Sequence, residues 1–200
     1  MADVLKNLPA SRMLASGRYG ASTGAAGVVA HEIMRASATL IAGRGQTAAV
    51  VQAASTAFGV ELCDLPRRVE SGAMEFIGVG PGRWLVFDDG DGDALADKLQ
   101  SALPRASVVD QSGGLAVFDV GGTKLAATLP KILSIDIDAA AFPVGAAATT
   151  TAAHINLTIW RTGAENWRCA VGRSYAPAFM RMLAVAAAEF GLAYGLGDSH

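Results

Sequence analysis

Residues 74–87 read MEFIGVGPGRWLVF, and this stretch decides how the first half of the chain is interpreted. Two apolar runs, 74–79 and 83–87, flank a Gly-Pro-Gly turn at 80–82. Glycine and proline between two such runs are strong signals of a turn between strands. A dinucleotide-binding glycine motif would instead need a strand-to-helix turn. We therefore predict an antiparallel hairpin at this position.

The segments around the hairpin complete a strand–helix–strand–strand–helix–strand order. Apolar residues at helical spacing predict helices at 46–58 and 91–103, and short strands are predicted at 38–41 and 108–110. Gly59 is expected to cap the first helix, because glycine readily adopts the left-handed conformation of a helix end. This order is the βαββαβ pattern of a ferredoxin-like unit.

The same order begins again after Gly113-Gly114. The predicted elements are strands at 115–120, 154–160 and 167–171, a helix at 123–129 ended by Pro130, a helix from 175 capped by Ser174, and a last edge strand at 192–194. A further strand, 28–33, precedes the first unit. The predicted fold is therefore α+β, with two consecutive ferredoxin-like βαββαβ units packed into one body.

Four segments follow from this interpretation. Residues 1–27 are rich in Gly, Ala and Ser and poor in large apolar side chains, which predicts a flexible N-terminal segment. The first ferredoxin-like half is placed at 28–112 and the second at 113–196. Residues 197–200 are expected to form a tail.

Composition limits the function classes. The 200 residues are 52% hydrophobic and 17% charged, with a net charge of -2, which excludes wholesale disorder and disfavours nucleic-acid binding through a large basic face. No apolar stretch suits a membrane span or a secretory signal. Two distant cysteines without a CxxC pair suit a reducing compartment, so a cytoplasmic protein is expected. A mean hydropathy of +0.34 points to apolar surface that faces a partner.

Catalytic signatures are missing from the sequence. It contains no G-x-S-x-G elbow, no H-E-x-x-H motif and no cysteines at metal-ligand spacing. Lys124 follows Thr123, whereas a phosphate-binding loop needs the opposite order. His31, beside Glu32 on an apolar strand, is interpreted as a structural histidine. We therefore predict no catalytic, cofactor-binding or metal-binding residue in this chain.

Eight residues are candidates for partner contact or for structural motifs. They are Arg83, Trp84, Asp110, Ser112, Trp160, Arg161, Arg173 and Ser174. Trp and Arg are enriched at binding hot spots, although each Trp could equally fill the core while its Arg is solvated. The Asp-Gln-Ser stretch at 110–112 is expected to form a tight turn bonded to the backbone. The guanidinium at 173 could clamp a carboxylate, a carbonyl-rich loop or a partner, and structural pairing is favoured.

Several stretches in order resemble the gamma subunits of heterotetrameric sarcosine oxidases, relatives of the folate-binding aminomethyltransferase fold. They are GPGRWLV at 80–86, VDQS at 109–112, the strand 115–121, IDID at 135–138 with Phe142 and Gly145, and VGRSYA at 171–176. The resemblance covers roughly residues 30–195. It departs at Pro130, which shortens a helix, and at the Ala-rich stretch 146–153.

The resemblance implies a non-catalytic subunit that stabilises a larger enzyme. Such oxidases demethylate sarcosine to glycine and pass the one-carbon unit to tetrahydrofolate. FAD, FMN, NAD and tetrahydrofolate would be bound by the larger alpha and beta subunits, which are the expected partners.

Two alternatives remain. The first is a free-standing folate-binding or aminomethyltransferase-like protein, in which Asp110 or Asp119 would hold the pterin amine. The second is the equivalent small subunit of an N-methylglutamate dehydrogenase.

Overall fold

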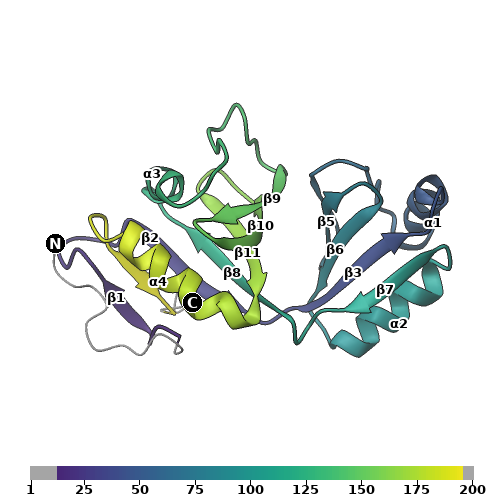
Figure 1. Ribbon diagram of the computed structural model, residues 1–200, viewed down its shortest axis with the longest axis horizontal. Coiled ribbons are helices and arrows are strands. Elements are labelled where there is room, and N and C mark those ends of the chain that lie inside the picture. Colours follow the sequence, from purple (N-terminus) through teal and green to yellow (C-terminus); the bar gives the residue numbers. More distant parts are fainter. Residues whose placement is uncertain (1–12, 196–200) are drawn as a thin grey trace. The chain divides into compact units, whose positions relative to one another are not determined.

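The computed structural model describes residues 13–195, which divide into two compact units. Unit 1 contains the described residues up to Ile33, then Ala116–Val144 and the residues from Thr149 onward. Unit 2 contains Met34–Leu115 and Gly145–Ala148. Each unit has one sheet and its own helices, and Figure 1 labels the elements.

Unit 2 is built on an antiparallel sheet in the order β4-β5-β6-β3-β7. Its elements are β3 (Ala36–Ala42), α1 (Thr47–Phe58), β4 (Arg68–Ser71), β5 (Met74–Gly80), β6 (Arg83–Asp88), α2 (Gly92–Ala102) and β7 (Ala106–Asp110). Without the short edge strand β4, which the sequence did not predict, the order is that of a ferredoxin-like unit. The predicted α+β class and ferredoxin-like order are confirmed.

The predicted hairpin is confirmed by the register of β5 and β6, in which Phe76 lies opposite Val86. Gly82 in its turn has φ of 63°, a left-handed conformation that glycine adopts without strain. Gly78 has a second constraint, because a Cβ there would lie 2.0 Å from the carbonyl oxygen of Leu65. Gly59, at φ 66°, caps α1 as predicted.

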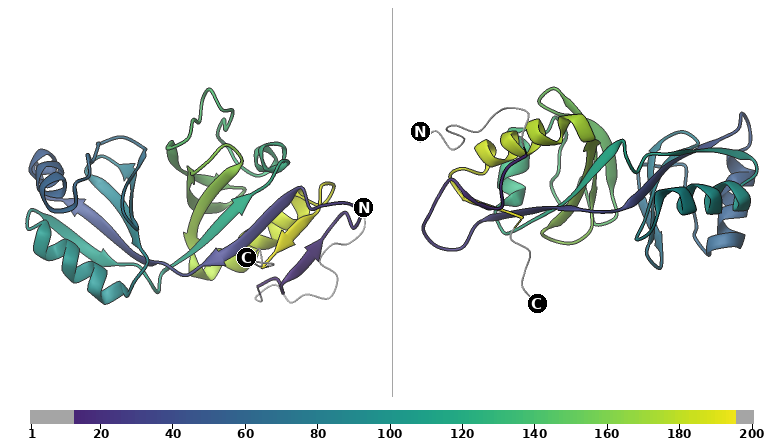
Figure 2. Two further views of the ribbon diagram at one scale, coloured as in Figure 1. Left: turned by 180° about the vertical axis from the view of Figure 1, so that it is seen from behind. Right: turned by 90° about the horizontal axis from the view of Figure 1, so that it is seen from below.

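The core of unit 2 forms where both helices pack against the sheet. Val50 and Ala54 of α1 and Leu95 and Leu99 of α2 join one buried cluster with strand residues that include Trp84. Figure 2 shows α2 running alongside β3 and β7.

Unit 1 contains a seven-stranded sheet in the order β1-β12-β2-β8-β11-β10-β9. Its strands are β1 (Gly17–Tyr19), β2 (Val28–Ile33), β8 (Leu115–Gly121), β9 (Ala147–Ala152), β10 (Ile155–Arg161), β11 (Asn166–Gly172) and β12 (Leu192–Tyr194). Its helices are α3 (Leu125–Thr128) and α4 (Ala176–Ala186), and the 3-10 turns are η1 (Leu129–Lys131) and η2 (Arg173–Tyr175).

The predicted start of the first half at residue 28 is wrong. Strand β2 pairs antiparallel with β8 and parallel with β12, so it belongs to the sheet of the second ferredoxin-like unit. In a ferredoxin-like unit the last strand, here β12, would lie beside β8. In this sheet β2 lies between β8 and β12. Residues 28 and 30 are fully buried in this position. The apolar alternation of a strand indicates that one of its faces is buried, but it does not identify the neighbouring strand with which it pairs.

The N-terminal segment also differs from its prediction. Residues 17–19 form β1, which pairs with β12, so the expected flexibility of 1–27 is wrong there. For the same reason β12 is not an edge strand. Residues 1–12 and the predicted tail at 197–200 lie outside the described residues.

In unit 1 the structure adds one strand that was not predicted, contradicts one local prediction and confirms another. The Ala-rich stretch 146–153 forms β9, which the sequence did not predict because alanine has low strand propensity. Ser174 lies inside η2 and makes no capping hydrogen bond; Tyr175 precedes α4 instead. Helix α3 ends at Thr128, and Pro130 lies in the 3-10 turn η1 that follows, so the predicted end of the α-helix before Pro130 is confirmed. No helix in the described part of the chain has the length and apolar character to cross a membrane.

Truncating the core of unit 1 should be costly. Phe118 of β8 and Phe179 of α4 are fully buried, with ring centroids 5.8 Å apart. We expect Phe118→Ala to lower the free energy of unfolding by about 3–5 kcal/mol, because it opens a cavity under α4. Urea denaturation measures this loss. The control Val185→Ala, at a side chain 44% exposed on the same helix, should change stability by less than about 0.5 kcal/mol.

Candidate functional site

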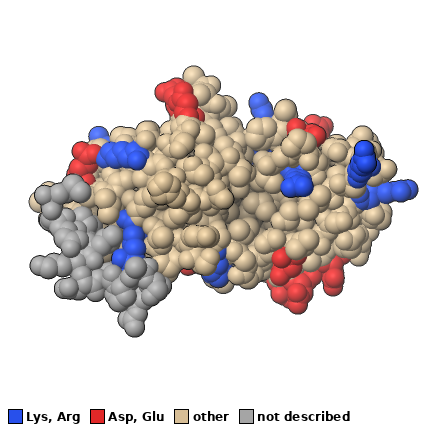
Figure 3. Space-filling model, in the orientation of Figure 1, with Lys and Arg blue, Asp and Glu red and all other residues tan. Residues whose placement is uncertain are grey.

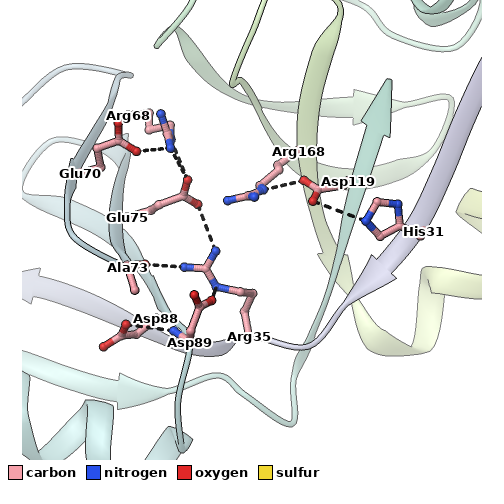
Figure 4. Close-up of polar contacts among 10 residues, drawn as sticks. All are labelled: His31, Arg35, Arg68, Glu70, Ala73, Glu75, Asp88, Asp89, Asp119 and Arg168. Carbon is pink, nitrogen blue, oxygen red and sulfur yellow. Dashed lines mark hydrogen bonds and ion pairs between the residues drawn. The ribbon is translucent and has the colours of Figure 1, made fainter. Parts of the chain in front are cut away.

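A row of polar side chains crosses three neighbouring strands of the seven-stranded sheet. His31 on β2 lies opposite Asp119 on β8, and Arg168 is on the next strand, β11. Arg168 Nε donates to Asp119 Oδ1 at 2.5 Å, and His31 Nε2 lies 3.6 Å from Asp119 Oδ2. Figure 4 shows both basic side chains directed at the one carboxylate. The row is therefore held together by a central acid.

The row opens into a hollow of about 420 Å³. Its other lining residues are Val29, Val120, Gly121, Gly122, Thr162, Asn166 and Trp167. A Cβ at position 121 would lie 2.6 Å from the side-chain oxygen of Asn166, so glycine keeps this wall open. The hollow offers a carboxylate, an imidazole, a guanidinium and an amide for hydrogen bonding. The described residues contain no group of three or more metal-ligating side chains.

Sequence reasoning interpreted His31 as structural and did not find the row. Its side chain is 42% exposed and paired with a carboxylate on another strand. The available signal was that His31 and Asp119 each place a polar side chain in a mostly apolar strand. Behind the row, Cys169 is fully buried, and this burial, with a smaller contribution from Asp119, raises the pKa of its thiol.

The predicted tryptophans lie in the core. Trp84 is 1% exposed, and its indole donates to the carbonyl oxygen of Cys63 at 3.0 Å. Trp160 is fully buried. It lies opposite Arg168 in the β10–β11 register, which places it next to the polar row. Arg83, in contrast, is exposed at the start of β6.

Arg161 holds a loop in place. It is 8% exposed, and its guanidinium donates to the carbonyl oxygens of Phe142, Gly163 and Ala164 at 2.9, 3.0 and 2.6 Å. The guanidinium carbon lies 4.8 Å from the Trp167 ring centroid, a cation–π arrangement. The carbonyl clamp that the sequence suggested for Arg173 is thus made by Arg161.

We expect Arg161→Met to lower the free energy of unfolding by about 3 kcal/mol, because three carbonyl groups lose a charged donor. Arg161→Lys should recover only part of this loss, since an ammonium cannot reproduce the guanidinium fork. Urea unfolding measures both variants. Arg83→Met is the matched control, and its exposed side chain should contribute less than about 0.5 kcal/mol. Equal losses at both positions would contradict the clamp.

Asp110 and Ser112 form the predicted tight turn. Asp110 Oδ1 accepts hydrogen bonds from the backbone N–H and the hydroxyl of Ser112, at 3.0 and 2.7 Å. The hydroxyl of Ser112 in turn accepts from the backbone N–H of Ser37 at 2.9 Å, which ties the turn to β3. These bonds, the backbone one first, lower the pKa of Asp110.

Ser112→Ala should raise the pKa of Asp110 part of the way back to its ordinary value of 3.8, because only the hydroxyl bond is lost. A lowered pKa stabilises the fold above the unfolded-state value, and this stabilisation is lost as the pH falls through the folded value. The stability difference between wild type and variant should therefore shrink in acid. Carboxyl titration by NMR measures the pKa. Ser107→Ala, on the same strand, should leave it unchanged.

Arg173 and Ser174 lie at the junction between β11 and α4. The Arg173 guanidinium donates to Glu32 Oε1 on β2 at 3.0 Å, and this pair is partly exposed. Ser174 is exposed in η2. Neither residue reaches the hollow, whose lining does not include them.

Unit 2 contains a buried ionic cluster that the sequence did not predict. Glu75 on β5 is 3% exposed and accepts two hydrogen bonds from Arg68, at 2.8 and 2.5 Å. Arg35 lies 3.8 Å from the other carboxylate oxygen and pairs with Asp89 at 2.9 Å. Arg68 also pairs with Glu70 (Figure 4). Buried carboxylates need such partners, so the cluster is consistent with a structural role.

Comparison with known proteins gives a consistent result. The sarcosine oxidase gamma subunit family model matches residues 42–189. The sarcosine oxidase subunit gamma of Corynebacterium sp. (strain U-96) is 31% identical over 156 residues, covering 74% of this chain and 73% of that protein. The subunit gamma of Arthrobacter sp. is 29% identical over 168 residues, covering 82% and 80%.

Solved structures agree. A chain of the heterotetrameric sarcosine oxidase from Corynebacterium sp. U-96, in complex with pyrrole 2-carboxylate, matches with a TM-score of 0.73 and 28% identity, covering 82% of this chain and 85% of that one. Aminomethyltransferase T of the Bartonella henselae glycine cleavage system matches with a TM-score of 0.61 and 12% identity, covering 84% and 48%. The second match shows the fold alone. The chain belongs to the sarcosine oxidase gamma subunit family.

Proposed function

We propose that this chain is the gamma subunit of a heterotetrameric sarcosine oxidase and that it stabilises the complex by binding the larger alpha and beta subunits. The observation that carries the proposal is the family match over residues 42–189, together with the TM-score of 0.73 to a chain of such an oxidase. Exposed apolar side chains on each unit support binding to protein partners: Met34 and Leu65 on unit 2 and Val144 on unit 1 are each more than half accessible.

The chemistry is assigned to the partners. Sarcosine would be oxidised to glycine there, and FAD, FMN, NAD and tetrahydrofolate would be bound by the larger subunits. In this chain, Asp119 pairs with Arg168, and Glu75 pairs with Arg68 and Arg35. These charged groups stabilise the two units by internal pairing, which supports a non-catalytic role.

Folate does not fit the two carboxylates considered for it. A pterin amine needs an acid that is available to accept its hydrogens. Asp110 already accepts two hydrogen bonds from Ser112, and Asp119 is bonded to Arg168 and faces His31. The proposal therefore includes no folate step in this chain. A cytoplasmic location without membrane or nucleic-acid binding is part of the proposal, in line with the net charge of -2.

The test is co-expression of the tagged chain with the alpha and beta subunits of its own organism, followed by affinity capture and size-exclusion chromatography. We expect one yellow assembly that contains all subunits and oxidises sarcosine. Omitting the chain should lower the yield and thermal stability of that assembly, while flavin spectra of the remaining subunits persist. Recovery of a colourless lone chain would overturn the proposal. A saturable tetrahydrofolate signal on that lone chain would favour a folate-binding protein.

A further inference from the structure

Three arginines come together at one end of unit 2, and this set is called the arginine end: Arg44, Arg83 and Arg105. They come from the β3–α1 loop, the first residue of β6 and the α2–β7 loop. Backbone hydrogen bonds join these segments, because Ala42 N–H donates to the Gly82 oxygen at 2.8 Å and Gly43 N–H donates to the Arg105 oxygen at 2.9 Å. Each arginine therefore lies at or next to a residue that forms one of these two backbone hydrogen bonds.

The three side chains are exposed, and none forms an ion pair or hydrogen bond with another described residue. This sets them apart from Arg35, Arg68 and Arg161, which are engaged inside their units. Figure 3 shows basic side chains on unit 2 in the region of α1. Helix α1 begins there without an acidic residue in its first turn, so its dipole adds to the positive potential.

Asp88 lies at the other end of the same strands, whereas Asp64 lies beside the arginine end. Ala36 at the start of β3 pairs with Asp88, whereas Ile41 near its end pairs with Arg83. Ile41 is five residue steps along β3 from Ala36, which corresponds to about 16 Å at ~3.3 Å per residue. That separation exceeds the Debye length at physiological salt, roughly 8 Å, so Asp88 does not neutralise the arginine end.

Two other features distinguish the arginine end from a surface that binds the phosphates of a nucleic acid. Asp64 accepts a hydrogen bond from Gly82 N–H at 2.6 Å, which places a carboxylate beside Arg83. Leu65, next in the chain, is 58% exposed, and its carbonyl lies against Gly78 of the hairpin. Arginines combined with an acid and an exposed leucine are typical of protein interfaces, while a nucleic-acid surface presents a larger uninterrupted basic face.

We propose that the arginine end binds an acidic segment of a partner subunit of the oxidase. Guanidinium groups pair with carboxylates through two parallel hydrogen bonds, and such pairs increase association rates as well as affinity. The leucine beside them supplies apolar contact. This inference rests on the proposed function, since it names the surface through which the chain joins its partners.

The test compares three forms of the chain in binding to the alpha–beta assembly by surface plasmon resonance. The first is wild type, and the second carries Arg44→Gln, Arg83→Gln and Arg105→Gln. The third is a matched control with the same change in net charge, made by Gln52→Glu, Ser55→Glu and Thr56→Glu on exposed positions of α1. Thermal unfolding should give the same midpoint for all three, because every altered side chain is exposed.

At low salt we expect the arginine variant to associate about tenfold more slowly than wild type, with the control within about twofold. The difference should largely vanish in about 1 M salt, where the Debye length is ~3 Å. Equal binding by wild type and the arginine variant would overturn this inference while leaving the proposed function standing. Failure of wild type to bind would overturn both. Binding of wild type to a DNA duplex, lost in the arginine variant, would overturn the assignment of a protein partner.

Discussion

The pairing of β2 with β8 is the constraint on which the rest of unit 1 depends. It adds a strand from the N-terminal part of the chain to the second ferredoxin-like unit, with residue 31 opposite residue 119. The other side of β2 pairs with β12, which in turn pairs with β1. Without β2, the β1–β12 pair would be separated from the rest of the sheet, and two paired three-residue strands are not stable alone.

The same pairing creates the polar row. Opposite residues in an antiparallel ladder project to the same face, so His31 and Asp119 meet, and Arg168 completes the row from β11. On the opposite face, Phe118 packs against Phe179 of α4. The strand β8 therefore separates a hydrophobic core from a hollow lined by charged groups. Alternation along one strand produces both surfaces.

Arginine has two distinct uses in this protein. Arg161 and Arg68 are largely buried, where their multiple donors satisfy carbonyls and a carboxylate that would otherwise be costly to bury. Arg44 and Arg105 on loops, and Arg83 at the start of β6, are exposed. Neither the residue type nor its immediate neighbours distinguishes the two uses. Arg83 precedes a tryptophan and Arg161 follows one, yet among the described residues only the Arg161 guanidinium of the two forms hydrogen bonds within the fold.

Much of the local structure followed from the sequence by itself. The hairpin at 80–82, the glycine cap at 59, the end of α3 before Pro130 and the ferredoxin-like order of elements all depend on residues close together in the chain. Glycine, proline and apolar spacing act over a few residues, so their effects can be predicted without knowing the rest of the molecule. The family resemblance also depended on short stretches in their order.

Only the tertiary structure decided how strands far apart in the chain pair. An apolar alternation at 28–33 predicts a strand, but the hydrogen bonds that place it beside β8 join residues far apart in the sequence. The hollow, the buried Glu75 cluster and the arginine end arise from such long-range pairings. Their residues become a surface or a site only when packing brings separate segments together, because charge and hydrogen bonding act over distances in space rather than along the chain.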